Sequence, residues 1–256
     1  PDGNGKLSKR DGDRLGFPVF PLEWKDPFSG EISSGYREKG YFPEAFINML
    51  ALLGWNPGTN QEIFSMPELI EAFSVERISK SGAKFDANKT KWFNQQYIKT
   101  IEPAMLAQMV KPQLDAKGIT VSADFLTEAC RLLSERLTFL NDFWEQGYFF
   151  FQQPDKYDEG ILKKKWKEGK RELFPELVER FEQLEDYTAT SLELETKAFM
   201  ETHSLGFGDL LPVLRIMLTG TMQGPSVFDT AVLIGKEETV RRMNKGLEVF
   251  SALVAQ

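Results

Sequence analysis

The sequence predicts a mainly α-helical protein in two parts, and three patterns support this. Apolar residues recur every three or four positions in several segments after residue 100, as helices with one face on a core require. Prolines open and glycines close several of the segments, which is typical of helix ends. No segment after residue 100 alternates apolar and polar residues in the manner of a strand. We place the boundary between the two parts near Thr100.

The first part, residues 1–100, is predicted to be a small mixed or helical domain. Its first 42 residues are rich in Asp-Gly, Phe-Pro, Asp-Pro and Ser-Gly pairs, which favour turns. A helix is expected over 43–54, because Pro43 stands in its first turn and Gly54 follows its last. Ser65 is the expected N-cap of a second short helix.

The second part, residues 101–256, reads as one helix after another, with a possible sub-boundary near residue 155. Two apolar stripes predict helices over 126–140 and 240–254. Further helices are expected over 162–184, 191–201 and 209–218, and Gly220 would close the last of these.

The composition is that of an ordinary globular chain and excludes several classes of site. The 256 residues are 41% hydrophobic and 27% charged, so wholesale disorder is excluded. A single cysteine, Cys130, and a single histidine, His203, exclude an intramolecular disulfide and a Cys/His zinc cage, so no metal site is expected. The sequence shows neither an apolar run of membrane-spanning length nor a signal peptide, and it opens as if inside a loop. We therefore expect a cytoplasmic chain with no membrane partner.

The net charge of −7 argues mildly against a nucleic-acid partner, but local patches decide such binding. Residues 1–100 hold 13 basic and 13 acidic groups, so the excess of acid lies in the second part. The strongest basic cluster spans 163–171 and includes Trp166. It fits either an RNA-backbone contact or a solvated helix face with Trp166 turned inward.

A second basic cluster, Lys6-Leu7-Ser8-Lys9-Arg10, lies among glycines and aspartates near the start. Three cations in a mobile loop could clamp a polyphosphate and stabilise negative charge as it develops. The alternative is a solvated basic loop.

The pentapeptide resembles the KMSKS-type loop of class I aminoacyl-tRNA synthetases. Later segments are similar, in the same order, to bacterial glutamyl-tRNA synthetases: 40–55, 85–86, 91–98, 218–220 and 224–228. The resemblance implies a C-terminal part that starts at this loop. Residues 1–100 would then include the tRNA stem-contact domain, and residues 101–256 the all-helical anticodon-binding cage. The family's catalytic nucleotide-binding fold and its His-x-Gly-His motif lie upstream, and a single histidine cannot supply that motif.

The resemblance also implies roles for individual residues. Lys9, supported by Lys6 and Arg10, would hold the ATP phosphates. The residues implied to contact tRNA are Arg136 and Arg215 at anticodon bases, Gly224 and Val227 beside them, and Trp92, Asn94 and Tyr97 near the stem. A planar guanidinium suits a base edge or a base face. The alternatives are a surface pair for Arg136, a buried ion pair for Arg215, and core positions for Trp92 and Tyr97.

The activity implied for the intact enzyme is ATP-dependent attachment of glutamate to tRNA-Glu, with Mg²⁺, and tRNA-Gln stays open as a further substrate. The fragment itself would hold no cofactor, would be inactive alone and would be a monomer. A different class also fits the sequence: a helical RNA-binding or protein-interaction module unrelated to aminoacylation. An autonomous enzyme is disfavoured by the absent histidines.

Compared with the family, about twenty extra residues intervene between the basic loop and the segment at residue 40. This insertion, near 16–35, carries the aromatic residues Phe17, Phe20, Trp24 and Phe28, with Tyr36 at its edge. It would either pack on its own domain or form a lid on the upstream catalytic domain.

Overall fold

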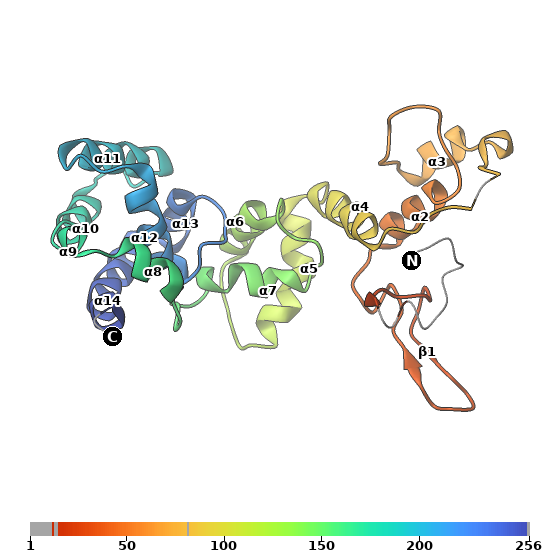
Figure 1. Ribbon diagram of the computed structural model, residues 1–256, viewed down its shortest axis with the longest axis horizontal. Helices are drawn as coiled ribbons and strands as arrows, with labels where there is room; N and C mark the ends of the chain where they lie inside the picture. The colour runs from red at the N-terminus through yellow and green to blue at the C-terminus, as the bar shows by residue number, and fades with distance from the viewer. Residues whose placement is uncertain (1–11, 13–14, 81, 255–256) are drawn as a thin grey trace. The chain divides into compact units, whose positions relative to one another are not determined.

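The computed structural model describes residues 12, 15–80 and 82–254 (Figure 1). Apart from one two-stranded antiparallel sheet, the regular structure of the described residues is helical, which confirms the predicted fold class. The chain divides into two compact units. The first comprises Pro1–Met109 with Ser134–Asp142, and the second Val110–Leu133 with Phe143–Gln256. The boundaries proposed near residues 100 and 155 stay predictions.

The first unit combines a β-hairpin with short helices. These are β1 (Trp24–Lys25), β2 (Ile32–Ser33), α2 (Pro43–Leu52), α3 (Met66–Ala72), the 3-10 turn η1 (Val75–Arg77), α4 (Ala87–Lys99) and the start of α5 (Pro103–Asp115). Pro43 lies in the first turn of α2, as predicted. Ser65 caps α3 in a full capping box, because its backbone N–H also donates to the Glu68 carboxylate at 2.7 Å.

The two ends of the insertion near 16–35 pack on its own unit, whereas most of residues 21–32 are exposed. Phe17 lies against Phe85 with the ring centroids 4.7 Å apart, and Tyr36 belongs to a buried cluster. Between the strands, the Asp26 carboxylate accepts the backbone N–H of Phe28 at 2.8 Å, which fixes the turn. Phe28 is 98% exposed and Trp24 is 38% exposed, so two of the five aromatic residues do not follow the packing interpretation.

One buried amide connects three segments of the first unit. Asn94 on α4 is fully buried, and its Oδ1 accepts the backbone N–H of Phe42 at 2.8 Å. Its Nδ2 donates to the carbonyl oxygens of Thr138 at 2.6 Å and Gly40 at 3.3 Å. A side chain with its donors and acceptor used in this way holds the backbone in place. The structure thus gives Asn94 a structural role rather than an exposed position.

We expect Asn94→Leu to destabilise the first unit by about 2–4 kcal/mol, because it leaves buried backbone groups at Phe42 and Thr138 without partners. Native-state hydrogen exchange of the α4 amides measures this opening free energy. Asn88→Leu, at an exposed position of the same helix, is the matched control and should change it by less than about 0.5 kcal/mol. Equal effects of the two substitutions would contradict the assignment.

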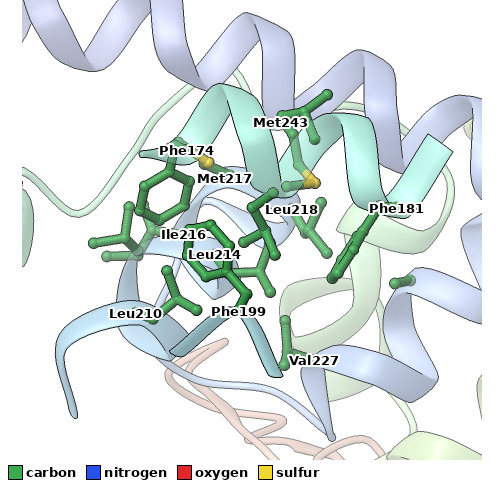
Figure 2. Packing of buried hydrophobic residues seen from close by; sticks show 14 of the residues in the cluster. Phe174, Phe181, Phe199, Leu210, Leu214, Ile216, Met217, Leu218, Val227 and Met243 are labelled. Atoms are coloured by element: carbon green, nitrogen blue, oxygen red, sulfur yellow. The ribbon is translucent and has the colours of Figure 1, made fainter. Parts of the chain in front are cut away.

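In the described residues of the second unit, all regular secondary structure is helical. Its elements are α6 (Ala123–Leu133), α7 (Asp142–Gly147), the 3-10 turn η2 (Tyr148–Phe150), α8 (Glu159–Lys165), α9 (Glu168–Arg171), α10 (Phe174–Gln183), α11 (Ala189–Thr202), α12 (Phe207–Thr219), α13 (Val227–Ile234) and α14 (Lys236–Val254). Helix α12 is apolar along most of its length and packs against α8, α13 and α14. Figure 2 shows Leu214, Met217 and Leu218 of α12 in one cluster with Phe174 and Phe181 of α10, Phe199 of α11 and Met243 of α14.

The predicted helices over 191–201, 209–218 and 240–254 are confirmed as parts of α11, α12 and α14. The single helix predicted over 126–140 is wrong, because α6 ends at Leu133. Beyond it, the Asp142 carboxylate accepts the backbone N–H groups of Thr138 and Phe139 at 3.0 and 2.8 Å, which fixes a turn instead.

The single helix predicted over 162–184 is also wrong. The backbone leaves the helical region at Trp166, whose side chain is only 1% exposed because it turns into the core. A proline in the first turn of α10 then starts a new helix.

A buried arginine connects α14 to two other elements of the second unit. Arg242 is 2% exposed, and its Nη1 donates to the carbonyl oxygens of Leu218 at 2.6 Å and Phe149 at 2.7 Å. Its Nε donates to Glu238 at 2.6 Å. Burial raises the pKa of the Glu238 carboxyl, but hydrogen bonds from Arg241 and Arg242 outweigh this, and the pKa lies below its ordinary value of 4.5.

We expect part of the acid sensitivity of the second unit to come from Glu238. Because its pKa is lowered on folding, its carboxylate stabilises the folded unit above pH 4.5, and this is lost as the pH falls through the folded pKa. Glu238→Gln should therefore be less stable than wild type near neutral pH, and the difference should shrink below pH 4.5. Thermal unfolding of both proteins from neutral pH to below pH 4.5 measures this difference in stability. Glu237→Gln, at the exposed neighbouring position, is the control, and an equal pH dependence of both variants would contradict the prediction.

Candidate nucleic-acid interface

Residues 219–226 comprise the last residue of α12 and the turn that leads to α13. This segment contains the predicted contact residue Gly224, and Arg215 and Val227 lie on the two helices beside it. Gly220 ends α12 with a left-handed φ of +77°, and its N–H donates to the Ile216 carbonyl at 2.8 Å. A Cβ at Gly220 would lie 2.4 Å from the Lys156 carbonyl oxygen, so a larger residue does not fit. The Thr219 hydroxyl lies 2.9 Å from the carbonyl oxygens of both Arg215 and Thr221, which fixes the first half of the turn.

Two further elements hold this turn from outside. The backbone N–H of Asp158, the N-cap of α8, donates to the Gly220 carbonyl at 2.9 Å. The Tyr148 hydroxyl donates to the Thr219 carbonyl at 3.1 Å. The backbone of the turn is therefore fixed by contacts to α8 and η2 as well as by its own residues.

Arg215 and Gly224, which the resemblance implies to contact tRNA, lie close together at this turn. Arg215 is half-buried, and its Nη1 donates to the Pro225 carbonyl at 2.5 Å. Gly224 has a φ of +139°, and a Cβ there would lie 3.4 Å from the Phe149 ring and 3.5 Å from Arg215 Nη1. A residue without a side chain at this point leaves room for close approach to the backbone.

Val227 departs from its predicted role. Its side chain is 4% exposed and belongs to the core of the second unit, as Figure 2 shows. Its side chain is therefore not available to a base, and a contact through the backbone at this position stays a prediction. The residue before it, Ser226, ends the turn as the N-cap of α13, and its hydroxyl oxygen accepts the Asp229 N–H at 3.4 Å.

Arg136 lies in the first unit, whereas Arg215 lies in the second. It is exposed in the turn that follows α6. The neighbouring Glu135 ties this turn to α4, because its carbonyl accepts the Gln95 side chain at 3.1 Å and its carboxylate lies 2.7 Å from Lys99. The backbone that carries Arg136 is therefore fixed, while its side chain faces solvent.

The three residues predicted near the tRNA stem are all on α4, and the structure gives them packing or hydrogen-bonding roles. Asn94 is the buried amide described above. Trp92 and Tyr97 are half-buried and pack against the aromatic cluster of the first unit. The Tyr97 hydroxyl donates to Asn48 at 2.8 Å, and burial raises its pKa. These contacts favour the core interpretation for Trp92 and Tyr97, and the stem contact stays a prediction.

The predicted phosphate-binding residues Lys6, Lys9 and Arg10 lie outside the described residues. Within the described ranges, no three His, Cys, Asp or Glu side chains are grouped to hold a metal ion. None of the described helices has the length and apolar character that crossing a bilayer requires. Cys130 is fully buried in α6, and burial raises the pKa of its thiol to about 12, so it is not a reactive thiolate.

Sequence reasoning missed the residues that support the turn: Tyr148, Phe149, Asp158 and Arg242. Phe149 and Arg242 are 93 residues apart in the chain, so no local pattern connects them. An arginine among apolar helix neighbours signals a buried cation that needs partners, and this pattern occurs at Arg215 but not at Arg242, which follows Arg241.

The chain matches two family models. Residues 105–247 match the anticodon binding domain, and residues 29–92 match part of the catalytic domain of class I tRNA synthetases (E and Q). The glutamate–tRNA ligase of Christiangramia forsetii is 49% identical over 248 residues, and that of Porphyromonas gingivalis W83 is 48% identical over 249 residues. Each alignment covers 97% of this chain and 49% of the relative, so the chain spans about half the length of these relatives.

Solved structures agree with the sequence relatives. A glutamate tRNA ligase from Elizabethkingia meningosepticum, in complex with its amino acid, has a TM-score of 0.90 and 44% identity, covering 98% of this chain and 50% of that chain. A glutamate-tRNA synthetase from Elizabethkingia anophelis has a TM-score of 0.84 and 43% identity, covering 97% and 49%. The resemblance that the motifs indicated is confirmed: the chain is similar to about half of the length of glutamate–tRNA ligases, and it belongs to the anticodon binding domain family.

Proposed function

We propose that this chain is the tRNA-recognition part of a ligase that attaches glutamate to tRNA-Glu with ATP. The observation that carries the proposal is the fixed turn 219–226 with Arg215 beside it, inside the stretch that matches the anticodon-binding family. Sequence-specific readers of RNA act mostly on unpaired bases, which side chains stack on and pair with. An anticodon loop supplies such bases.

The chemistry of the turn suits this task. The Arg215 guanidinium is planar, keeps its charge and offers several N–H donors, so it can pair with a base edge or stack on a base. Its bond to the Pro225 carbonyl holds it in one orientation before RNA arrives. Gly224 next to it has no side chain, so a base or phosphate can approach the backbone closely.

Arg136 supplies a second such group from the first unit. It stands exposed on a turn that Asn94 and Lys99 hold against α4. A fixed turn with an exposed arginine can read a base without first ordering its own backbone.

In the intact ligase, Lys9 with Lys6 and Arg10 would hold the ATP phosphates, and ATP with Mg²⁺ would be used by the whole enzyme. Lysine is a compact charge that can follow the phosphates as their geometry changes. The 256-residue chain by itself would bind tRNA as a cytoplasmic monomer without turnover.

We expect Arg215→Ala to weaken binding of a tRNA-Glu transcript by roughly 1–3 kcal/mol, because one bidentate base contact has that value. Fluorescence anisotropy with the 256-residue chain, at about 150 mM salt to screen exposed charges, gives the Kd. A transcript with substituted anticodon bases should show a similar loss with the wild-type chain. The variant should discriminate less between the two transcripts.

The control is Arg180→Ala, because Arg180 pairs with Glu176 and Glu195 on α10 and α11 rather than with the turn. It should leave anticodon discrimination unchanged. If wild type holds both transcripts equally, the chain does not read the anticodon and the proposal fails. Absence of tRNA binding would favour the helical protein-interaction alternative.

We expect Arg136→Ala also to lower discrimination by more than about 1 kcal/mol, and to do so with little effect on stability, because the side chain is exposed. The same anisotropy assay measures the discrimination, and a thermal melt measures the stability. Lys111→Ala, at an exposed lysine paired with Asp115, is the control for loss of a surface cation. Equal binding losses for the two variants would show a general charge effect and contradict base reading by Arg136.

A further inference from the structure

Helix α8 and the residues after it gather positive charge in a chain that is acidic as a whole. Residues 159–171 hold six lysines or arginines and two glutamates, whereas the whole chain carries −7. Three of the lysines, Lys163, Lys164 and Lys167, are exposed, and they are called the cationic strip below. Such a concentration produces a locally positive field whatever the total charge.

The backbone that carries the cationic strip is anchored in the core. Leu162 is fully buried, and Trp166 is 1% exposed with its ring edge-on to Phe174 at 5.1 Å and to Phe250 at 5.8 Å. Trp166 therefore turns inward, as one of the two interpretations of this cluster states. It follows that Trp166 cannot stack on bases, and the strip offers charge alone.

The charges on the strip are only weakly neutralised by described neighbours. Lys163 lies 3.7 Å from Glu159, and both side chains are more than half exposed, so this pair contributes little. Lysines in the last turn of α8 also complement the helix dipole, which explains part of the pattern. Lys167 lies beyond the helix end and has no such role.

The strip is connected to the turn described above. The N-cap of α8, Asp158, donates its N–H to the Gly220 carbonyl, and α8 packs along α12 (Figure 1). At a rise of about 1.5 Å per residue, Lys164 lies roughly 10 Å along α8 from that contact. A nucleic-acid strand carries a phosphate about every 3.4 Å of its axis in a duplex, so an RNA held at the turn has phosphates within this reach.

We propose that the cationic strip binds backbone phosphates of the RNA whose bases meet the turn 219–226. This inference rests on the proposed function. Lysine is a strongly hydrated point charge that suits phosphate oxygens and carries no base preference. The strip therefore supplies affinity and salt dependence, while Arg215 supplies the choice of base.

The test is the salt dependence of binding by the double variant Lys164→Gln with Lys167→Gln. Glutamine forms helix about as well as lysine at Lys164, and Lys167 is exposed beyond the helix end, so the fold is kept. Loss of two phosphate contacts should reduce the slope of log Kd against log salt by about 1.4–1.8 and raise Kd near 150 mM salt roughly tenfold. The ratio of Kd values for native and anticodon-substituted tRNA-Glu should not change.

The matched control is Lys197→Gln with Lys245→Gln, two half-exposed lysines on α11 and α14 that pair with glutamates. It removes the same charge from the same unit and should keep the wild-type slope. Phosphate binding by the cationic strip would be contradicted by equal slopes for the two double variants. A wild-type slope for Lys164→Gln with Lys167→Gln would contradict it as well.

An unrelated RNA hairpin separates the two proposals. If the wild-type chain binds both RNAs without discrimination, the proposed function fails, while a reduced slope for the strip variant still supports phosphate binding. If the chain binds neither RNA, both proposals are overturned.

Discussion

The buried charge of Arg242 is the constraint on which the geometry of the second unit depends. A cation out of water is strongly unfavourable unless hydrogen bonds replace its hydration. Arg242 satisfies this with the carbonyls of Leu218 and Phe149 and the carboxylate of Glu238. Burial lowers its pKa, and Glu238 opposes that shift. If the end of α12, the turn η2 and α14 moved apart, the buried guanidinium would lose its hydrogen-bond partners, so these three elements stay together.

The candidate recognition turn is built on these fixed elements. Leu218 immediately precedes Thr219 and Gly220, and the ring of Phe149 borders Gly224 and thereby Arg215. The first unit has a similar arrangement with an uncharged buried group, because the Asn94 amide holds the segment that carries Arg136. In both units an arginine stands next to a turn whose backbone is fixed by a buried polar side chain. Such preorganisation lowers the entropy lost when a flexible single strand binds.

The sequence predicts the local features well and the long-range contacts poorly. The cap at Ser65, the proline at the start of α2 and the glycine at the end of α12 are each set by neighbouring residues, and all three were predicted. The end of α6 at Leu133 was not, because it depends on Asp142 and on packing against a helix some forty residues earlier. Asn94 and Val227 were assigned to RNA contacts for the same reason, since their burial is decided by distant segments.

The net negative charge of the chain is compatible with an RNA-binding role. At physiological ionic strength a surface charge is screened beyond about 8 Å, so distant acidic groups act weakly on a phosphate at α8 or at Arg215. Non-specific RNA binding depends on many scattered lysine and arginine contacts. If the proposed function holds, acidic groups elsewhere on the surface would disfavour RNA in orientations other than the one that brings its bases to Arg215. The acidity then contributes to discrimination rather than opposing binding.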